Sequence, residues 1–141
     1  MTKFFVFLAF FAVSSLSQSC WNEKVIHAKK DGINIVVIPE NGRHYVVINP
    51  DSNFSRDFIN QNYIEVRVKG GIEPFNYLVL YFDTLTNKNL IGYSGEVLNI
   101  KLDSTYIFVK NVHHVCYDEK YFLKRSCTQF DLFSMLYGRY K

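Results

Sequence analysis

The sequence predicts an all-β protein whose mature part is a single antiparallel β-sandwich. Apolar and polar side chains alternate along residues 63–69 and again along residues 96–102, as in a strand with one buried face. Between them, residues 75–82 are almost entirely apolar, as expected of a strand covered on both faces. Short stretches rich in glycine, proline and asparagine separate these runs and favour turns.

The chain begins with a segment typical of a secretory signal peptide. Lys3 precedes the apolar residues 4–13, and small side chains lie directly before Cys20. The apolar run is shorter than the about 20 residues that a membrane-spanning helix needs. We therefore expect cleavage after residues 1–19 and secretion of residues 20–141. A bacterial lipoprotein would also place a cysteine here, but the preceding residues fit that motif poorly.

The first half of the mature chain predicts three strands joined by tight turns. Residues 25–28 predict a short edge strand, and residues 33–38 a β-branched strand that Pro39 ends. The Asn-Gly pair at 41–42 favours the positive φ values of a two-residue hairpin. Residues 44–48 are then the return strand.

A polar, irregular segment follows at residues 51–62. Phe54, Phe58 and Ile59 are spaced as in a helical turn. Asn53 begins an Asn-Phe-Ser sequon, which predicts an exposed side chain and, in a eukaryotic secretory pathway, a glycan.

The two alternating strands and the apolar strand between them predict the core. Glycines and a proline at residues 69–75 favour a connection, residues 83–89 a polar loop, and residues 90–93 a short strand. The expected buried rows are Ile64, Val66 and Val68 in the first strand and Leu98, Ile100 and Leu102 in the last.

This region resembles known β-sandwich families. A Gly-Gly pair, a Pro-aromatic pair and a strand are followed by Ser-Thr-Tyr-x-Phe and a cysteine, which is similar to PKD/SprB-type repeats of surface adhesins. More broadly it resembles immunoglobulin-like and fibronectin-III-like sandwiches. The matching residues are Gly70, Gly71, Pro74, Phe75, Tyr77, Thr105, Tyr106, Phe108 and Cys116. The resemblance implies an immunoglobulin-like fold in which Tyr106 closes a corner by bonding to the chain upstream.

The mature chain has three cysteines, which an oxidising compartment would bond where geometry allows. We favour a bond between Cys116 and Cys127, which closes a loop of about a dozen residues and adds roughly 3 kcal/mol. Cys20 is an alternative partner for either one. If it stays unpaired, it can link two chains as a covalent homodimer.

The C-terminal residues 128–141 contain apolar side chains whose spacing fits a short amphipathic helix nearly as well as a strand. The sequence does not decide between helix and strand for these residues. An apolar tail of this kind is expected to pack over an open end of the core.

Known catalytic and metal-binding motifs are not found in the sequence. His113 and His114 lie near Cys116, but neighbouring residues on a strand point to opposite faces, and an oxidised cysteine is not a nucleophile. The cysteine spacing gives no metal site. After loss of Lys3 the formal net charge falls from +3 to +2, which does not favour nucleic acid as a partner. We expect no enzyme activity, no cofactor and no transmembrane anchor.

The sequence therefore predicts a secreted, non-catalytic binding module that recognises an extracellular protein or glycan. An exposed aromatic patch would carry the binding, and its candidates are Phe75, Tyr77, Tyr81 and Tyr93. Two alternatives remain open. One is a secreted viral or parasite factor that modulates its host. The other is a small secreted hydrolase or enzyme inhibitor, which a cleft holding His44 or His113 beside a carboxylate would support.

Overall fold

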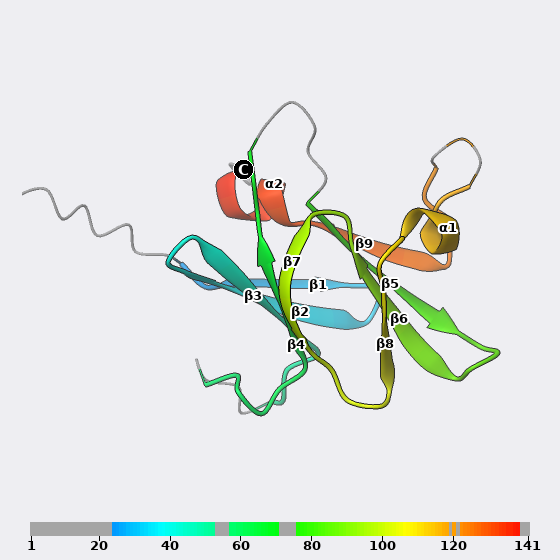
Figure 1. The fold of residues 1–141 in the computed structure, drawn as a ribbon, viewed down its shortest axis with the longest axis horizontal. Helices are drawn as coiled ribbons and strands as arrows, with labels where there is room; N and C mark the ends of the chain where they lie inside the picture. The colour runs from blue at the N-terminus through cyan, green and yellow to red at the C-terminus, as the bar shows by residue number, and fades with distance from the viewer. Residues whose placement is uncertain (1–23, 53–56, 71–75, 119, 121, 139–141) are drawn as a thin grey trace, which may run out of the picture.

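The structure is a computed structural model that describes residues 24–52, 57–70, 76–118, 120 and 122–138. The described part contains nine β-strands and two short helices, and the strands form two sheets (Figure 1). The predicted all-β class is confirmed.

Several predicted features lie outside the described residues. These are the signal peptide at residues 1–19, Cys20, the sequon residue Asn53, and Phe75.

The first sheet has five antiparallel strands, with β1 at one edge and β7 at the other. In spatial order they are β1 (Ile26–Lys30), β2 (Ile33–Glu40), β3 (Arg43–Ile48), β4 (Tyr63–Arg67) and β7 (Glu96–Lys101). The hairpin between β2 and β3 turns at Asn41 and Gly42, whose φ angles are 51° and 76°. Positive φ at both positions is what the Asn-Gly pair predicts.

Strand β2 continues through Pro39, where the sequence predicted its end. Pro39 lies opposite His44 of β3, next to the closing pair of the hairpin, so its nitrogen points away from β3. On that other side, β1 accompanies β2 only as far as Val37, which pairs with Ile26. The missing N–H of the proline therefore breaks no bond between strands.

The second sheet has four strands and includes one parallel pair. In spatial order they are β8 (Tyr106–Val109), β6 (Lys88–Tyr93), β5 (Tyr77–Asp83) and β9 (Cys127–Asp131). The prediction of purely antiparallel pairing is wrong for β6 and β8, which run parallel with Asn89 opposite Tyr106. Between β6 and β8 the chain passes through β7, which belongs to the first sheet and carries the chain back. The chain therefore enters β8 beside the start of β6, and the two strands run in the same direction.

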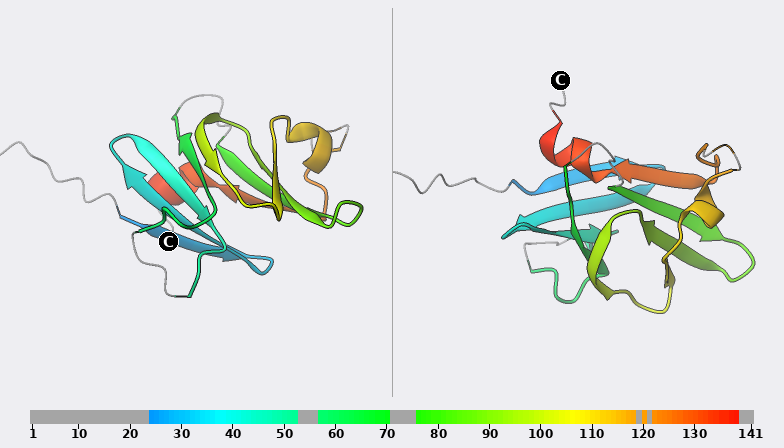
Figure 2. Two further views of the ribbon diagram at one scale, coloured as in Figure 1. Left: turned by 60° about the horizontal axis from the view of Figure 1, so that its bottom comes forward. Right: turned by 45° about the horizontal axis from the view of Figure 1, so that its top comes forward.

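The two sheets are distinct in the ribbon (Figure 2), and side chains from both belong to one apolar cluster. Both sheets contribute fully buried side chains, and Ile64 and Val66 of the predicted row are among them, with Val68 8% exposed. The other fully or nearly buried core residues include Ile35, Val37, Val46 and Ile48 from the first sheet and Leu78, Leu80, Ile91 and Phe130 from the second.

The second predicted buried row is wrong in part. Leu98 and Ile100 of β7 are 36% and 40% exposed, whereas Leu102 packs against the core. The register between β4 and β7 shifts between Glu65 and Val66, so that Val97 rather than Leu98 lies opposite the buried Val66 and packs against the core. Ile100 lies opposite Ile64, but β7 is at the edge of its sheet.

Two hydrogen bonds join the β1 edge of the first sheet to the β9 edge of the second. The Lys30 ammonium donates to the backbone carbonyl of Gln129 (3.4 Å), and the Thr128 hydroxyl donates to the Asp31 carboxylate (2.9 Å).

The C-terminal segment contains both a strand and a helix. Strand β9 leads directly into α2 (Leu132–Tyr137), and the Asp131 carboxylate accepts the backbone N–H of Ser134 at 3.0 Å as an N-cap. Leu132 and Met135 are buried, so α2 covers one end of the core, as predicted for an apolar tail.

The resemblance implied that Tyr106 bonds to the chain upstream. Its hydroxyl oxygen accepts a hydrogen bond from the Asn49 side chain at 3.3 Å. Asn49 directly follows β3, so this contact joins the start of β8 to the first sheet.

Candidate binding groove

A one-turn helix, α1 (His113–Cys116), lies on the face of the second sheet that points away from the core. The sequence predicted a strand here, with His113 and His114 on opposite faces, and this is wrong. Val112 and Cys116 are four residues apart and both buried, so helical spacing places them together on the sheet. His113 and His114 are exposed on the other side of the turn.

Gly92 of β6 allows this segment to approach the sheet closely. A Cβ atom built at Gly92 would lie 2.8 Å from the Cβ of Val112, which is closer than real Cβ contacts. A side chain at this position would therefore push α1 away from the sheet.

A disulfide between Cys116 and Cys127 fastens α1 to β9, with the two Cα atoms 5.7 Å apart. Both cysteines are buried beside Val79. The enclosed loop folds back on itself: the Asp118 N–H donates to the Phe122 carbonyl (3.0 Å) and the Lys124 N–H to the Cys116 carbonyl (2.8 Å). The bond and these contacts hold the described part of the loop against the outer face of the second sheet.

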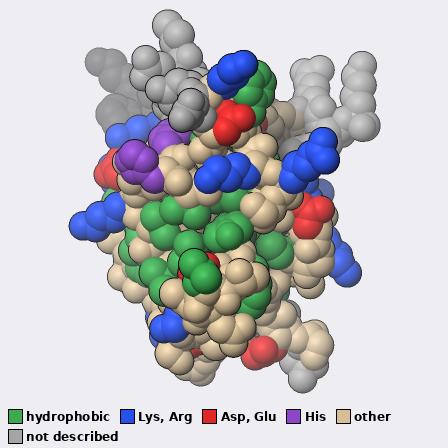
Figure 3. Space-filling model, turned by 90° about the vertical axis from the view of Figure 1, so that its right-hand side faces the viewer, with side chains coloured by type: hydrophobic (Ala, Val, Ile, Leu, Met, Phe, Trp, Pro, Cys, Tyr) green, Lys and Arg blue, Asp and Glu red, His purple; other side chains and the backbone are tan. Residues whose placement is uncertain are grey.

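A groove of about 560 Å³ opens between this loop, α1 and the sheet. Figure 3 shows hydrophobic side chains gathered on the side of the molecule that carries α1, β5 and β6. Phe122 is 64% exposed and Leu123 is 36% exposed, so the loop adds apolar surface to the groove. The described lining residues are Tyr77, Ser94, His113, Tyr117, Phe122, Leu123 and Gln129.

Polar contacts fix the inner wall of the groove. The Tyr117 hydroxyl donates to the Gln129 side-chain carbonyl at 2.6 Å, and the Tyr117 ring lies 5.0 Å from the His113 ring, centroid to centroid. Burial, with a smaller contribution from Tyr77, raises the pKa of Tyr117, so its phenol stays protonated as a donor at neutral pH. The Tyr77 N–H donates to the Ser94 hydroxyl at 2.9 Å, which fixes the groove's other side.

This combination of rings and amide suits binding. Aromatic side chains offer large rigid surfaces, and the Gln129 side chain adds a polar group between them. Among the residues that the structure describes, no group of three or more His, Cys, Asp or Glu side chains is placed to hold a metal ion.

The structure separates the predicted aromatic candidates. Tyr77 lines the groove, and Tyr81 lies half-buried on the same outer face, in a cross-strand row with Leu90 and Ile107. Tyr93 is only 3% exposed and points into the core, so it adds nothing to an exposed patch.

Sequence reasoning missed the loop residues Tyr117 and Phe122. The one available signal was the disulfide itself, because closing Cys116 to Cys127 forces the aromatic residues between them onto β9. The position of Gln129 two residues after Cys127 then places its side chain beside them.

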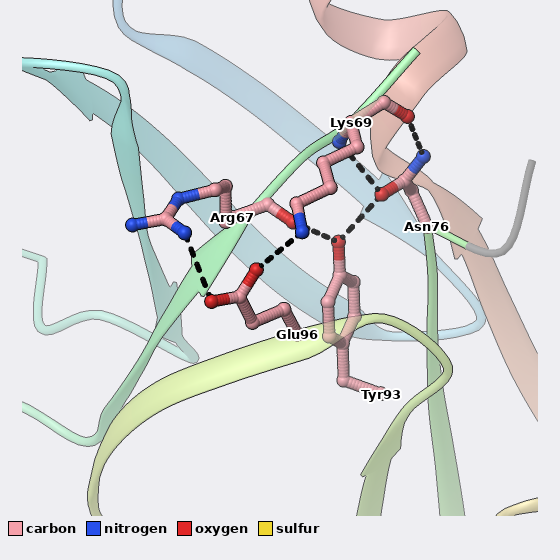
Figure 4. A network of polar contacts seen from close by, with 5 residues as sticks. All are labelled: Arg67, Lys69, Asn76, Tyr93 and Glu96. Atoms are coloured by element: carbon pink, nitrogen blue, oxygen red, sulfur yellow. Dashed lines mark hydrogen bonds and ion pairs between the residues drawn. The ribbon is translucent and has the colours of Figure 1, made fainter. Parts of the chain in front are cut away.

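Tyr93 instead belongs to a polar network inside the molecule (Figure 4). Its hydroxyl donates to the Asn76 side-chain carbonyl at 3.0 Å, and that oxygen also accepts the Lys69 N–H at 3.2 Å. The Asn76 amide donates to the Lys69 carbonyl at 2.8 Å. Beside it, Glu96 binds Arg67 at 2.9 Å and Lys69 at 2.7 Å. The network joins the ends of β4, β5 and β6.

Burial raises the pKa of Tyr93 above its ordinary value of 10.0. The folded protein therefore keeps this proton when the unfolded chain has lost it. Stability is complete below about pH 10 and falls as pH rises further, by up to about 1.4 kcal/mol per pH unit for one proton. We expect Tyr93→Phe to flatten this alkaline slope in urea titrations between pH 9 and 11. An unchanged slope in the variant would show that other tyrosines cause it.

Comparison of the chain with protein-family models, curated proteins and solved structures finds no match. Of the helices in the described ranges, none has both the length and the apolar character to span a bilayer.

Proposed function

We propose that this protein is a secreted, non-catalytic binding module that recognises an extracellular protein or glycan through the groove beside the Cys116–Cys127 loop. In this proposal the two sheets form an immunoglobulin-like β-sandwich, and residues 1–19 are its cleaved signal peptide. The disulfide supports the extracellular location, because such bonds persist in oxidising compartments.

The observation that carries the proposal is the exposed position of Phe122 at the edge of an aromatic groove. A largely exposed phenylalanine costs free energy in water, and aromatic anchors contribute most of the binding energy at many interfaces. The groove's volume of about 560 Å³ lies within the range of about 300–1,000 Å³ typical of ligand pockets.

The rim favours a protein partner over a glycan. Phe122 and Leu123 are apolar and adjacent on the loop, and the bonded pair of Tyr117 and Gln129 lies on the inner wall. An apolar or aromatic side chain of a partner can pack against this rim while the Gln129 side chain bonds to its backbone.

A covalent homodimer through Cys20 remains part of the proposal. The disulfide uses two of the three mature cysteines, so Cys20 is left to pair between chains. Such a dimer would present two grooves and raise the apparent affinity for a clustered partner.

The test is a screen of the mature protein against arrayed extracellular proteins and glycans, followed by variants. We expect Phe122→Ala to weaken binding to any specific partner by tenfold or more, corresponding to about 1.4 kcal/mol or more. Phe82→Ala is the matched control, because Phe82 is also exposed (49%) but does not line the groove. Equal binding by both variants, or a screen without specific partners, would contradict the proposal.

A further inference from the structure

A second groove, of about 820 Å³, lies at the end of the molecule that α2 covers. Its walls come from four separate segments: the residues at the start of β1, the β2–β3 hairpin, the end of β4 with the residues after it, and α2. It shares none of its described lining residues with the groove beside the disulfide.

The floor of this groove is apolar. Val25 and Ile26 are half-buried at the start of β1, and Val68 and Met135 are each only 8% exposed. Leu136 of α2 is half-buried and adds a further aliphatic side chain. A long aliphatic chain could contact these residues along its length and leave water.

The rim is positively charged. Lys24, Arg67 and Lys69 line the groove, and no Asp or Glu is among its described lining residues. Glu96 lies outside the groove and binds both Arg67 and Lys69, so these three side chains together keep one positive charge (Figure 4). The exposed Lys24 adds a second. The rim therefore complements an anion.

We propose that this groove binds a single-chain fatty acid. The aliphatic floor takes the acyl chain, and the carboxylate lies at the rim near Lys24 and Lys69. Charge complementarity selects an anionic head group, and the apolar floor selects a long aliphatic chain. A concave groove suits one chain rather than the surface of a bilayer. This site is separate from the proposed partner-binding groove and does not depend on it.

Octanoate and decanoate are suitable probes, with 1-octanol as the uncharged counterpart of octanoate. In calorimetric titrations we expect one site, tighter binding for decanoate by up to about fourfold per added methylene, and binding of 1-octanol weaker by tenfold or more. Chemical-shift changes at the backbone amides of Ile26 and Leu136 would locate the site.

Charge reversal provides the matched pair of variants. Lys24→Glu should weaken octanoate binding by tenfold or more, whereas Lys88→Glu, in the β5–β6 hairpin away from the groove, should leave it unchanged. Phe122→Ala should also leave octanoate binding unchanged. A failure of the proposed partner binding can therefore be told apart from a failure of fatty-acid binding. The proposal is overturned if octanoate does not bind, if 1-octanol binds as tightly, if both lysine variants behave alike, or if only anionic vesicles bind.

Discussion

Replacing both Cys116 and Cys127 with alanine is expected to lower the free energy of unfolding by about 3 kcal/mol. The bond closes a short loop, and its loss increases the conformational freedom of the unfolded chain. It also removes the disulfide cross-link that holds α1 against β9. Urea denaturation of the oxidised parent and the double variant measures the difference.

The control for this prediction is Cys20→Ala. If Cys116 bonds to Cys127, the Cys20 variant should keep the parent stability within about 0.5 kcal/mol. A loss of about 3 kcal/mol in Cys20→Ala would show instead that Cys20 is bonded to Cys116 or Cys127, because that variant and the double variant would then remove the same bond.

The loop that the disulfide closes also carries Phe122 and Tyr117. With the bond removed, these side chains should lose their fixed position over β9, even where the sheets stay folded. We therefore expect the double variant to lose partner binding at temperatures well below its unfolding midpoint. This links the stability of the loop to the function of the groove.

Asn76→Ala is expected to lower the free energy of unfolding by about 3 kcal/mol. The Asn76 side chain is buried and makes three hydrogen bonds, to the Tyr93 hydroxyl and to both backbone groups of Lys69. Alanine would leave these partners without their bonds in a poorly solvated region, and each such loss costs about 1–3 kcal/mol. The matched control is Asn99→Ala, because Asn99 is exposed and its side chain accepts the neighbouring Ile100 N–H at 2.9 Å.

A double-mutant cycle identifies the origin of this loss. Tyr93→Phe removes the hydroxyl group that donates to Asn76. In a protein that already carries Asn76→Ala, this substitution should therefore lower the free energy of unfolding by less than it does in the parent. Strict additivity of the two variants, or a loss below 1 kcal/mol for Asn76→Ala, would contradict the role given to this network.

Local sequence patterns predicted the first sheet well. The Asn-Gly turn and the burial of Ile64, Val66 and Val68 depend on neighbouring residues, and both agree with the structure. The alternation is wrong at Glu65, which was expected on the wet face but is only 6% exposed and pairs with Arg43 at 2.9 Å. The exposure of Leu98 and Ile100 was not predictable in the same way. The register shift beside Glu65 interrupts the pairing of β7 with β4, so that Val97 and not Leu98 lies opposite Val66, and the edge position of β7 depends on strand order.

The errors around β8 and α1 have a similar cause. The parallel pairing of β6 with β8 follows from the path of the chain through the other sheet, which no local pattern records. Helix α1 is a single turn, too short for a periodic signal, and it is held by the close contact at Gly92 and by the disulfide.

The candidate groove was predictable only in part. Tyr77 was identified as an aromatic binding candidate, but Tyr93 was grouped with it and lies on the opposite face, where it pairs across from Leu78. Phe122 could be recognised only once the loop was closed onto β9. Tertiary contacts therefore determine which aromatic side chains are exposed.

The central claim is that the mature protein is exported with the Cys116–Cys127 loop closed, since the groove depends on that bond. Mass spectrometry of the protein recovered from the culture medium, before and after reduction, tests it directly. We predict a chain beginning at Cys20 and a pair of peptides joined through Cys116 and Cys127. Protein that stays inside the cell, begins at Met1 and carries three free thiols would contradict the account.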